Sequence, residues 1–482
     1  MKIKNTKLVN ILNSNLTELI TKVEYETDCI KASNLLTPNR LDIVAKYLYV
    51  KYRELGIESQ FANDLYLEHI KAFNGFVEND ESQKIGKEAF LKSFDSIIDS
   101  IKEGGFNENN IVPLAKDQTI IDGAHRVACS IYFDEEVTTV SLDAEEQNFN
   151  YAFFEQRGLD RIYLDAMAFE YARLKDNVFM VIVWPTAKEH EVELQSILTK
   201  YGEIVYRKDI PLNSNGLVHL VKQAYRTESW LGSYANDFEG ARNKARWCYN
   251  ESGTVRAFLL ESDKDLIAMK DEIRDVFKIE KHAVHINDTK EETIELAELL
   301  FNQNSINWMN GANLKEYKKF NELFLQYSNW FAKNNLLKED FTLIGGVLAI
   351  YGVRESFDLD YICKDNKVYD FGDEKIELET KKVQYAPVKL DELIYNPRYY
   401  FYAHGQKFVT LDILKEIKQK RGIGKDLEDV VMLDTLIKNG RYVESFVDKV
   451  KKYTSLSFWK RNIKFILLKI RFMIFFIIKK IK

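Results

Sequence analysis

The chain has 482 residues, of which 46% are hydrophobic and 13% aromatic, and this composition excludes an intrinsically disordered protein. The length predicts about three domains. The net charge is −6, but residues 457–482 carry eight basic side chains and no acidic one, which leaves −6 − 8 = −14 on the rest. An acidic body argues against nucleic acid as a partner, because that binding depends on neutralising phosphates.

The cysteines give no sign of a disulfide framework or a metal site. Cys29, Cys129, Cys248 and Cys363 lie far apart and include no Cys-x-x-Cys pair. The first residues lead into a polar, amphipathic stretch without the apolar core of a signal sequence. We therefore expect reduced thiols and a cytoplasmic location.

Apolar residues at helical spacing predict a helical N-terminal segment over residues 1–39 and further helices beyond it. A helix is expected over 87–101, ending at Gly104-Gly105. A strand over 111–114 and a polar turn follow, and then a second strand leads into a tight glycine turn and a helix.

Residues 122–126 read Asp-Gly-Ala-His-Arg and resemble the Asp-Gly-x-His-Arg motif of the ParB/sulfiredoxin-like fold. We assign residues 40–150 to such a unit. The resemblance implies that the motif opens a helix that holds nucleotide phosphates, with Glu68 or Glu78 as the acid that related kinases use as a base. The alternative is an ordinary turn before a helix with a buried histidine. The implied nucleotide-binding residues are Asp122, Gly123, His125 and Arg126.

The middle third predicts strands over 177–185, 203–207 and 255–261, with amphipathic helices over 189–201 and 291–301. Asp288 and Thr289 are residue types that favour a helix start, and Glu291 and Glu292 suit its first turn.

In the order of their predicted elements and in short stretches of sequence, residues 175–305 resemble a remote nucleoside diphosphate kinase-like unit with a ferredoxin-like α+β fold. The resemblance implies that Arg274 binds phosphate and that His285 is a catalytic phosphohistidine. Trp184 stands where that family has a catalytic lysine, and His282 where it has asparagine, which puts kinase turnover in doubt. A purely structural α/β insert is the alternative.

Two glycines and two aspartates follow a predicted strand over 341–344. Gly345 and Gly346 can let phosphates approach the backbone before a helix that starts at residue 347. Asp358 and Asp360 are one residue apart, so on a strand they point to one face and can share a divalent ion. The alternative is a surface turn with two solvated aspartates.

A glycine pair followed by Asp-x-Asp resembles the signature of the nucleotidyltransferase superfamily, and we assign residues 306–450 to this domain. The resemblance implies Mg²⁺, a nucleoside triphosphate (ATP or CTP) and a third acid on a neighbouring strand. We expect Asp412 there, on a strand over 407–414. The helix after it resembles the helix that follows the third carboxylate in small family members. The implied metal ligands are Asp358, Asp360 and Asp412, the implied nucleotide-binding residues are Gly345, Gly346 and Arg354, and the helix carries Lys420, Arg421, Lys425, Asp426 and Asp429.

Residues 451–482 are predicted to form a basic amphipathic helix. Its longest uncharged apolar run, over 472–478, has seven residues, whereas a spanning helix needs about 20. A basic face opposite a wide apolar face predicts a helix lying on an anionic membrane surface. Docking on another subunit is the alternative.

Together these patterns predict a multidomain α/β protein: a ParB/sulfiredoxin-like unit, a ferredoxin-like middle, a nucleotidyltransferase-fold domain and a membrane-surface tail. The expected function is Mg²⁺-dependent nucleotidyl or phosphoryl transfer to a small molecule or surface-polysaccharide precursor at the inner face of the cytoplasmic membrane. Two alternatives stay open: a nucleotidyltransferase-type toxin or defence effector that modifies RNA or protein, and a nucleotide-sensing scaffold without turnover.

Overall fold

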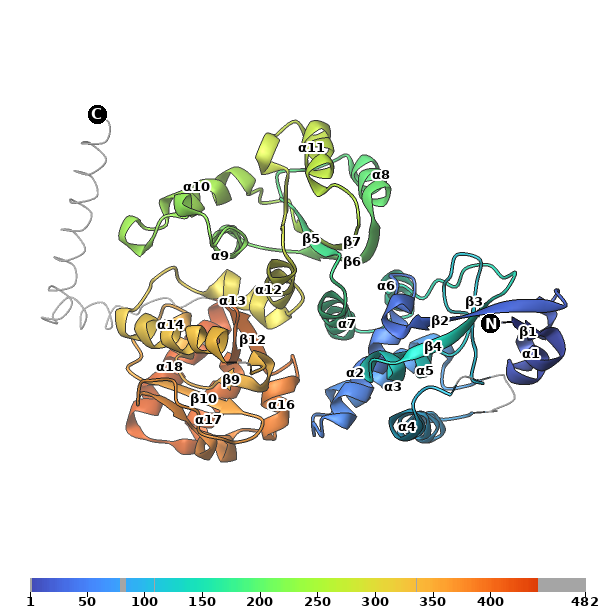
Figure 1. Cartoon of the computed structure of the whole chain (residues 1–482). Helices are drawn as coiled ribbons and strands as arrows, with labels where there is room; N and C mark the ends of the chain where they lie inside the picture. The colour runs from blue at the N-terminus through green and yellow to red at the C-terminus, as the bar shows by residue number, and fades with distance from the viewer. Residues whose placement is uncertain (1, 79–83, 108, 335, 441–482) are drawn as a thin grey trace, which may run out of the picture.

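The computed structural model describes residues 2–78, 84–107, 109–334 and 336–440. It shows a mixed α/β protein with three sheets, each at the centre of one unit (Figure 1). The expected surface helix at 451–482 lies outside the described residues. Of the helices that the structure describes, none is both long and apolar enough to cross a membrane.

The N-terminal unit holds a four-stranded sheet in the order β1-β2-β4-β3. Its strands are β1 (Lys2–Lys4), β2 (Glu24–Lys31), β3 (Val112–Leu114) and β4 (Glu136–Ser141). Its helices are α1 (Asn5–Ile11), α2 (Asp42–Glu54), α3 (Phe61–Asn74), α4 (Lys87–Gly104) and α5 (Ala124–Tyr132), with 3₁₀ turns at Ser14–Leu19 and Ala32–Leu35.

The helical prediction for residues 1–39 is wrong for two segments, because β1 and β2 are strands. β2 pairs antiparallel with both β1 and β4, yet only Tyr25 on it is buried. A strand with one buried side chain has no period-two hydrophobic pattern to detect. The predicted helix over 87–101 and the strand at 111–114 are confirmed by α4 and β3.

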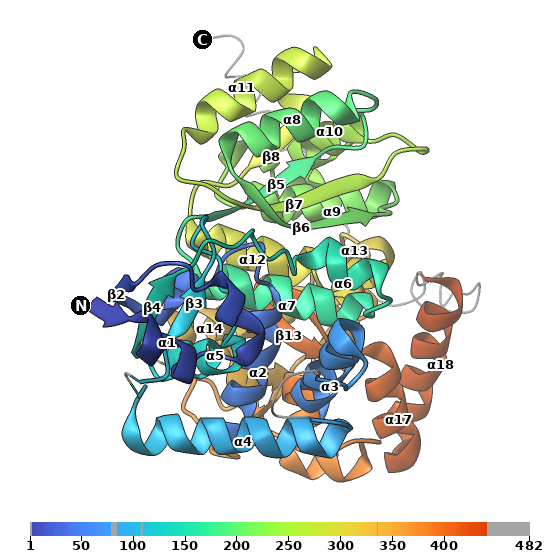
Figure 2. The same cartoon turned by 90° about the vertical axis from the view of Figure 1, so that its right-hand side faces the viewer.

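The middle unit has an antiparallel sheet in the order β6-β7-β5-β8, and the strands and helices predicted for this region are confirmed. Helices α8 and α11 cover one face, and α7 and α12 pack on the other (Figures 1 and 2). The strands are β5 (Val178–Val183), β6 (Glu203–Ile210), β7 (Val255–Glu261) and β8 (Val284–Ile286). The helices are α6 (Tyr151–Gln156), α7 (Arg161–Leu174), α8 (Glu191–Tyr201), α9 (Ser214–Ala224), α10 (Glu239–Cys248), α11 (Leu266–Phe277) and α12 (Lys290–Leu300).

The C-terminal unit is built on a mixed five-stranded sheet in the order β11-β10-β9-β13-β12. The strands are β9 (Phe341–Leu343), β10 (Leu359–Cys363), β11 (Ile376–Leu378), β12 (Tyr400–Ala403) and β13 (Gln406–Val409). The helices are α13 (Gln303–Gly311), α14 (Lys318–Lys333), α15 (Val347–Ile350), α16 (Leu390–Tyr395), α17 (Leu411–Arg421) and α18 (Gly424–Asn439).

Two predictions for this unit are wrong. Asp412 does not lie on a strand, because β13 ends at Val409 and Asp412 occupies the first turn of α17, where a carboxylate favours the helix start. The single helix expected to carry Lys420 and Asp429 is two helices, because Gly422 adopts a left-handed conformation (φ 64°) and ends α17.

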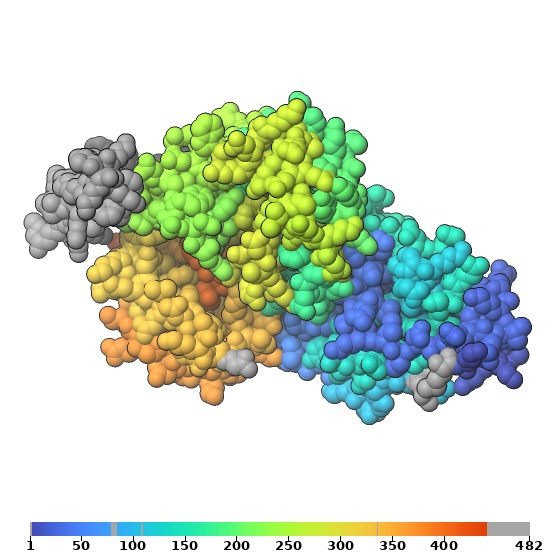
Figure 3. Space-filling view, turned by 45° about the horizontal axis from the view of Figure 1, so that its top comes forward, coloured from blue at the N-terminus to red at the C-terminus, as the bar shows by residue number. Residues whose placement is uncertain are grey.

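The three units share one hydrophobic core, which includes Leu41, Val205 and Leu343. Helices α7 and α12 lie between the middle sheet and the other two units (Figures 1 and 2). A buried ion cluster joins the units as well: Lys51 pairs with Glu170 at 2.9 Å and with Glu339 at 3.7 Å. The space-filling view shows the units packed against one another (Figure 3).

Candidate functional site

The glycine pair is fixed by close packing against β10 and α14. The backbone N–H groups of Ile344 and Gly345 donate to the carbonyl of Asp360 at 2.9 and 3.0 Å. A Cβ on Gly345 would lie 2.6 Å from the backbone nitrogen of Asp360. Gly346 has φ +72°, and a Cβ there would lie 2.5 Å from Cε2 of Phe320. The pair therefore brings the turn before α15 directly against the second aspartate.

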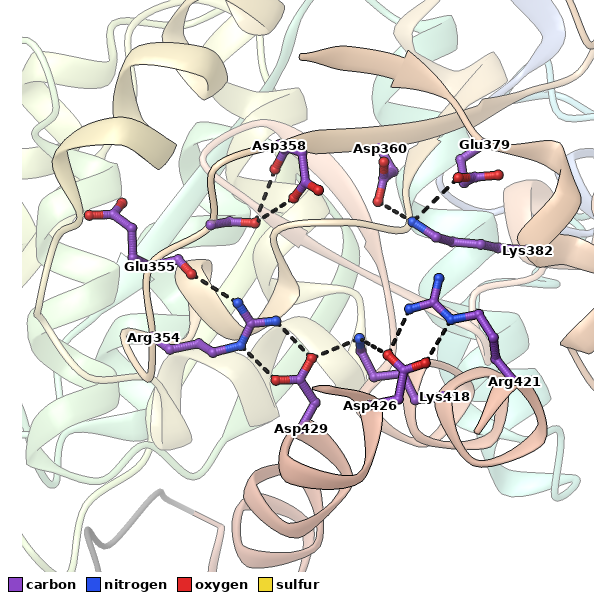
Figure 4. A network of polar contacts seen from close by, with 11 residues as sticks. Arg354, Glu355, Asp358, Asp360, Glu379, Lys382, Lys418, Arg421, Asp426 and Asp429 are labelled. Carbon is purple, nitrogen blue, oxygen red and sulfur yellow. Dashed lines mark hydrogen bonds and ion pairs between the residues drawn. The ribbon is translucent and has the colours of Figure 1, made fainter. Parts of the chain in front are cut away.

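The two aspartates lie together at the start of β10 (Figure 4). Asp360 is buried on the strand, and Asp358 precedes the strand with its carboxylate accepting from Ser356 Oγ at 3.2 Å. Burial raises the pKa of Asp360, and so does the charge of Asp358. Lys382 opposes this rise, because its ammonium forms an ion pair with the Asp360 carboxylate. The structure thus holds two carboxylates that repel each other and one cation that relieves part of the repulsion.

Cationic side chains from the loop after α15 and from α17 lie across from these aspartates (Figure 4). Arg354 makes two bonds to the Asp429 carboxylate, at 2.6 and 2.7 Å. Lys418 contacts Asp429 at 2.7 Å and Asp426 at 3.1 Å, and Arg421 makes two bonds to Asp426, at 2.6 and 2.7 Å. The two acids on α18 therefore hold three cations in place.

The ion pairs lower the pKa of the Asp426 carboxyl. Burial alone would raise the pKa of this carboxyl, but hydrogen bonds from Arg421 and Lys418 hold it well below its usual range. Asp426 is therefore ionised at neutral pH, and its partners are fixed as charged donors.

The glycine pair, the two aspartates and the cationic side chains, but not Asp426 and Asp429, line a small cavity of about 60 Å³. It has room for an ion or one to two waters but does not enclose a nucleotide. The structure brings five predicted site residues together here: Gly345, Gly346, Arg354, Asp358 and Asp360.

Asp412 is not among the residues that line the cavity, although Leu414, Ile417, Lys418 and Arg421 of the same helix are. Its charge acts on the phenol of Tyr351 instead. Within the described residues, no three His, Cys, Asp or Glu side chains are close enough together to hold a metal ion.

Glu379 and Lys382, which follow β11, are site residues that the sequence patterns above did not predict. This strand runs parallel to β10 with Glu377 opposite Asp360, so the chain after it passes beside the second aspartate. Glu379 also raises the pKa of Asp360, after the larger effects of burial, Lys382 and Asp358. A signal existed, because Ile376-Glu377-Leu378-Glu379 alternates apolar and acidic residues, as half-buried strands do.

The Asp-Gly-Ala-His-Arg segment opens α5 as expected, with Gly123 in a left-handed conformation (φ +95°). His125, however, is half-buried against α3 and α4. Its Nε2 is 3.1 Å from the hydroxyl of Tyr66, and its ring packs edge-on against Phe94 at 4.6 Å between centroids. Burial holds the pKa of His125 well below 6.5. A neutral, half-buried imidazole packed among aromatic rings is closer to the alternative interpretation than to a side chain that binds phosphate.

Arg126 folds back over its own turn. Its Nη2 lies 3.8 Å from Asp122, and a Cβ on Gly123 would meet the same nitrogen at 2.9 Å. Arg126 lines a second cavity, of about 370 Å³, with serines of α4. Neither candidate acid lines this cavity: Glu68 pairs with Lys71 at 2.9 Å and Glu78 with Lys84 at 2.5 Å.

His285 and Arg274 line a third cavity, in the middle unit, together with residues of α10 and β8. The ring of His285 lies against that of Tyr225 at 4.6 Å, and burial lowers the pKa of His285 to about 4. Arg274 pairs with Asp271 at 3.0 Å. These residues line a different cavity from Asp358 and Asp360, so the predicted site residues belong to three places rather than one.

In comparisons with known proteins, no protein-family model, no curated protein and no solved structure matches the chain.

Proposed function

We propose that the chain is a Mg²⁺-dependent transferase that moves a nucleotidyl or phosphoryl group from ATP or CTP to a small molecule or surface-polysaccharide precursor. One observation carries the proposal: Asp358 and Asp360 face a cavity whose other wall is cationic (Figure 4). Transfer of a phosphorus group requires carboxylates that hold a metal ion and cations that stabilise phosphate charge.

The donor set fits Mg²⁺, which is usually bound by one or two carboxylates together with waters and substrate phosphates. Asp358 and Asp360 provide two such carboxylates on one side of the turn. The raised pKa of Asp360, caused first by burial and then by Asp358, marks a site where added positive charge is favourable. Mg²⁺ would supply charge neutralisation and polarise the phosphate that reacts.

The chain's own residues account for the remaining requirements. Arg354, Lys418 and Arg421 are fixed by Asp426 and Asp429, so they can receive phosphate oxygens without first losing side-chain freedom. Lys382 must release Asp360 for a metal ion to bind there, and it can then pair with a phosphate. The nucleotide itself would extend beyond the small cavity.

Asp412 has no place in this proposal as a metal ligand, because the structure keeps it out of the cavity. Glu379 is the acid nearest to the role that we expected of Asp412. It follows a strand that pairs with β10, and it lies 3.6 Å from the Lys382 ammonium (Figure 4).

The unit assignments are part of the same proposal. The middle sheet, ordered β6-β7-β5-β8 with helices α8 and α11 in the two crossings, has the β-α-β-β-α-β sequence of a ferredoxin-type unit and supports that assignment. The turn at Gly123 before α5 supports the ParB/sulfiredoxin-like assignment, although the contacts of His125 with Tyr66 and Phe94 argue against a nucleotide contact by that side chain.

We also propose a peripheral position at the inner membrane face through the basic tail at 451–482. Sedimentation of the full chain with anionic vesicles, compared with a chain truncated at residue 450, tests this. Equal partitioning of both proteins onto the vesicles would rule the tail out as the anchor.

The transfer reaction is tested by incubating the full chain with ATP or CTP, Mg²⁺ and a cell extract, and by searching for a nucleotidylated or phosphorylated product by mass spectrometry. The matched control is the Asp358→Asn, Asp360→Asn double variant. A product that forms with the wild type and not with the double variant supports the proposal. A product formed equally by both proteins would remove the two aspartates from the reaction.

A further inference from the structure

The middle unit contains a cavity of about 760 Å³ that the proposed transfer reaction does not use. Its wall is formed by α10, α11, β8 and the segment that follows α9, all within one unit (Figure 1). This volume is in the range of sites that bind small molecules, about 300–1,000 Å³. The cavity is therefore large enough for a ligand, and the chemistry of its wall indicates the class of that ligand.

Two exposed indole rings lie in the wall. Trp247, on α10, is 67% exposed, and Trp230 is 43% exposed, although tryptophan is usually well buried. The Trp247 ring stacks on that of His282, with centroids 5.8 Å apart and 28° between planes, which leaves its opposite face to the ligand. The Trp230 ring lies 5.3 Å from that of Tyr225, and its backbone carbonyl packs onto Gly240, where a Cβ would not fit. Both indoles are thus held in place while remaining exposed.

The charges around the cavity balance. Four lysine and arginine side chains line it, and they face three carboxylates, those of Glu228, Asp288 and Glu292. The remaining positive charge is matched by Asp271, which does not line the cavity and pairs with Arg274 at 3.0 Å. A diphosphate would bring at least two further negative charges to a wall that already carries three carboxylates. A ligand without net charge therefore suits this wall better than a phosphate.

Two buried nitrogens in the wall lack partners. Nε of Arg274 and Nε2 of His285 make no hydrogen bond within the described residues. Burial lowers the pKa of His285 to about 4, so its ring is neutral at neutral pH, and Nε2 either donates or accepts according to the tautomer. Glu228 and Asn243 add exposed acceptors, and the Asn243 amide is also a donor. A hydroxyl both donates and accepts, so a ligand with several hydroxyls can satisfy all these groups.

We propose that this cavity binds a carbohydrate without net charge, whose pyranose ring stacks on the exposed face of Trp247. The C–H groups on one side of a sugar ring carry a small positive charge and meet the negative face of an aromatic ring. The hydroxyls of the same ring bond to Arg274 Nε and His285 Nε2. This ligand class differs from the phosphate that the resemblance of residues 175–305 implies, and the site is separate from Asp358 and Asp360.

The test is titration of the full chain with the methyl glycosides of glucose, galactose, mannose and N-acetylglucosamine, followed by saturation-transfer NMR. At least one glycoside should bind with a dissociation constant on the order of 1 mM, because one stacked ring and a few hydrogen bonds form the contact. The ring C–H protons should receive the largest saturation transfer, because they face the indole. The Asp358→Asn, Asp360→Asn double variant should bind equally well. Loss of binding in that variant would place the sugar at the aspartate cavity and overturn the proposal.

Substitution of Trp247 tests the stacking. Trp247→Ala should weaken the glycoside at least about tenfold, and Trp247→Phe should retain most of the affinity, because it keeps an aromatic face. The side chain is largely exposed, so neither variant should prevent folding. The matched control is Tyr234→Ala, at an exposed aromatic residue of the same unit that does not line the cavity. An affinity in Trp247→Ala equal to that of the wild type would overturn the proposal.

Substitution of Arg274 tests the hydrogen bond. Arg274→Met should weaken the glycoside about fivefold, because it removes the buried Nε donor at similar side-chain length. Arg246→Met, at an exposed arginine beside Trp247 that does not line the cavity, is the control and should have no effect. Equal affinities in Arg274→Met and the wild type would remove this side chain from the site and contradict the proposed contact.

Competition decides between a sugar and a phosphate as the ligand. Pyrophosphate and ADP, each added in EDTA to exclude metal-dependent binding, should not displace the glycoside at concentrations near its own dissociation constant. Displacement by either compound would identify an anion site and overturn the proposal. It is equally overturned if none of the glycosides binds the wild type.

Discussion

Two tight glycine turns in this protein each open a helix, and they use the side chains after the turn in opposite ways. The turn at Gly345 and Gly346 leads to Asp358 and Asp360, which line a cavity. The turn at Gly123 leads to His125, which is half-buried and lies in hydrogen-bond contact with Tyr66. Similar backbone geometry thus precedes cavity-lining carboxylates in one unit and a packed histidine in the other.

The difference teaches that burial and partners, rather than the turn, decide what such a segment can do. Asp360 is buried beside another carboxylate, which is electrostatically unfavourable and is partly relieved by Lys382. His125 is half-buried with a hydrogen bond and aromatic contacts, which is favourable. Unrelieved electrostatic repulsion between side chains suggests a functional role, whereas side chains with all their polar groups paired suggest a structural one. Substitutions at the two turns should therefore have opposite signatures.

The largest expected effect is on activity at the first turn. Asp358→Asn should reduce transfer at least about 100-fold, because it removes a proposed metal ligand, while the melting temperature stays the same or rises as repulsion with Asp360 is relieved. Steady-state rates and thermal denaturation measure the two effects. Glu374→Gln, at an exposed carboxylate before β11, is the control and should change neither. A strongly lowered melting temperature in Asp358→Asn would contradict the comparison.

The second turn should show the reverse. His125→Ala should lower the free energy of unfolding by about 1–3 kcal/mol, because it removes the packing against Phe94 and one of the two hydrogen-bond contacts of the Tyr66 hydroxyl. Chemical denaturation measures this change. His190→Ala, at a half-exposed histidine on the surface, should stay within about 0.5 kcal/mol of the wild type. Equal losses in the two variants would show that the contacts of His125 with Tyr66 and Phe94 do not stabilise the fold.

A smaller effect concerns the pH dependence of transfer. Lys382 lowers the pKa of Asp360 against the larger influence of burial, so Lys382→Met should raise that pKa further. Asp360 then takes up a proton at a higher pH, and the acidic limb of kcat/KM should move upward by about one pH unit. Lys381→Met, one residue away, is the control. A limb that moves downward would show that Lys382 does not act on Asp360.

The smallest effect is on stability in mild acid. Burial holds the pKa of His125 below its unfolded value of 6.5, so below that pH the unfolded chain binds a proton that the folded chain does not. Stability therefore falls as the pH drops from 6.5. His125→Phe should remove about 1 kcal/mol of this fall by about pH 5.5. The buried residues His69 and His219 act in the same direction, so the difference between variant and wild type is what counts. An unchanged pH dependence would refute the assignment.

The sequence predicted elements with strong local patterns and failed where pairing between distant segments decides the structure. The apolar run of β5 and the amphipathic pattern of α8 are sufficient to predict a strand and a helix from local sequence alone. Asp358 and Asp360 are separated only by Leu359, so their proximity in the structure was predictable. Glu379 reaches them only because the three-residue strand β11 pairs with β10. Asp412 follows a strand of similar pattern, but the chain turns into a helix two residues after Val409.

The hydrophobic core that contains Leu41, Val205 and Leu343 couples the stabilities of the three units. A chain with separate cores loses its parts one at a time on heating, whereas a shared core favours a single cooperative transition. A cut after residue 150 would expose apolar surface on both fragments, and each would be prone to aggregate rather than to fold alone. Exchanging one unit for an unrelated domain by recombination should therefore destabilise the protein, because each unit contributes side chains to the core of its neighbours.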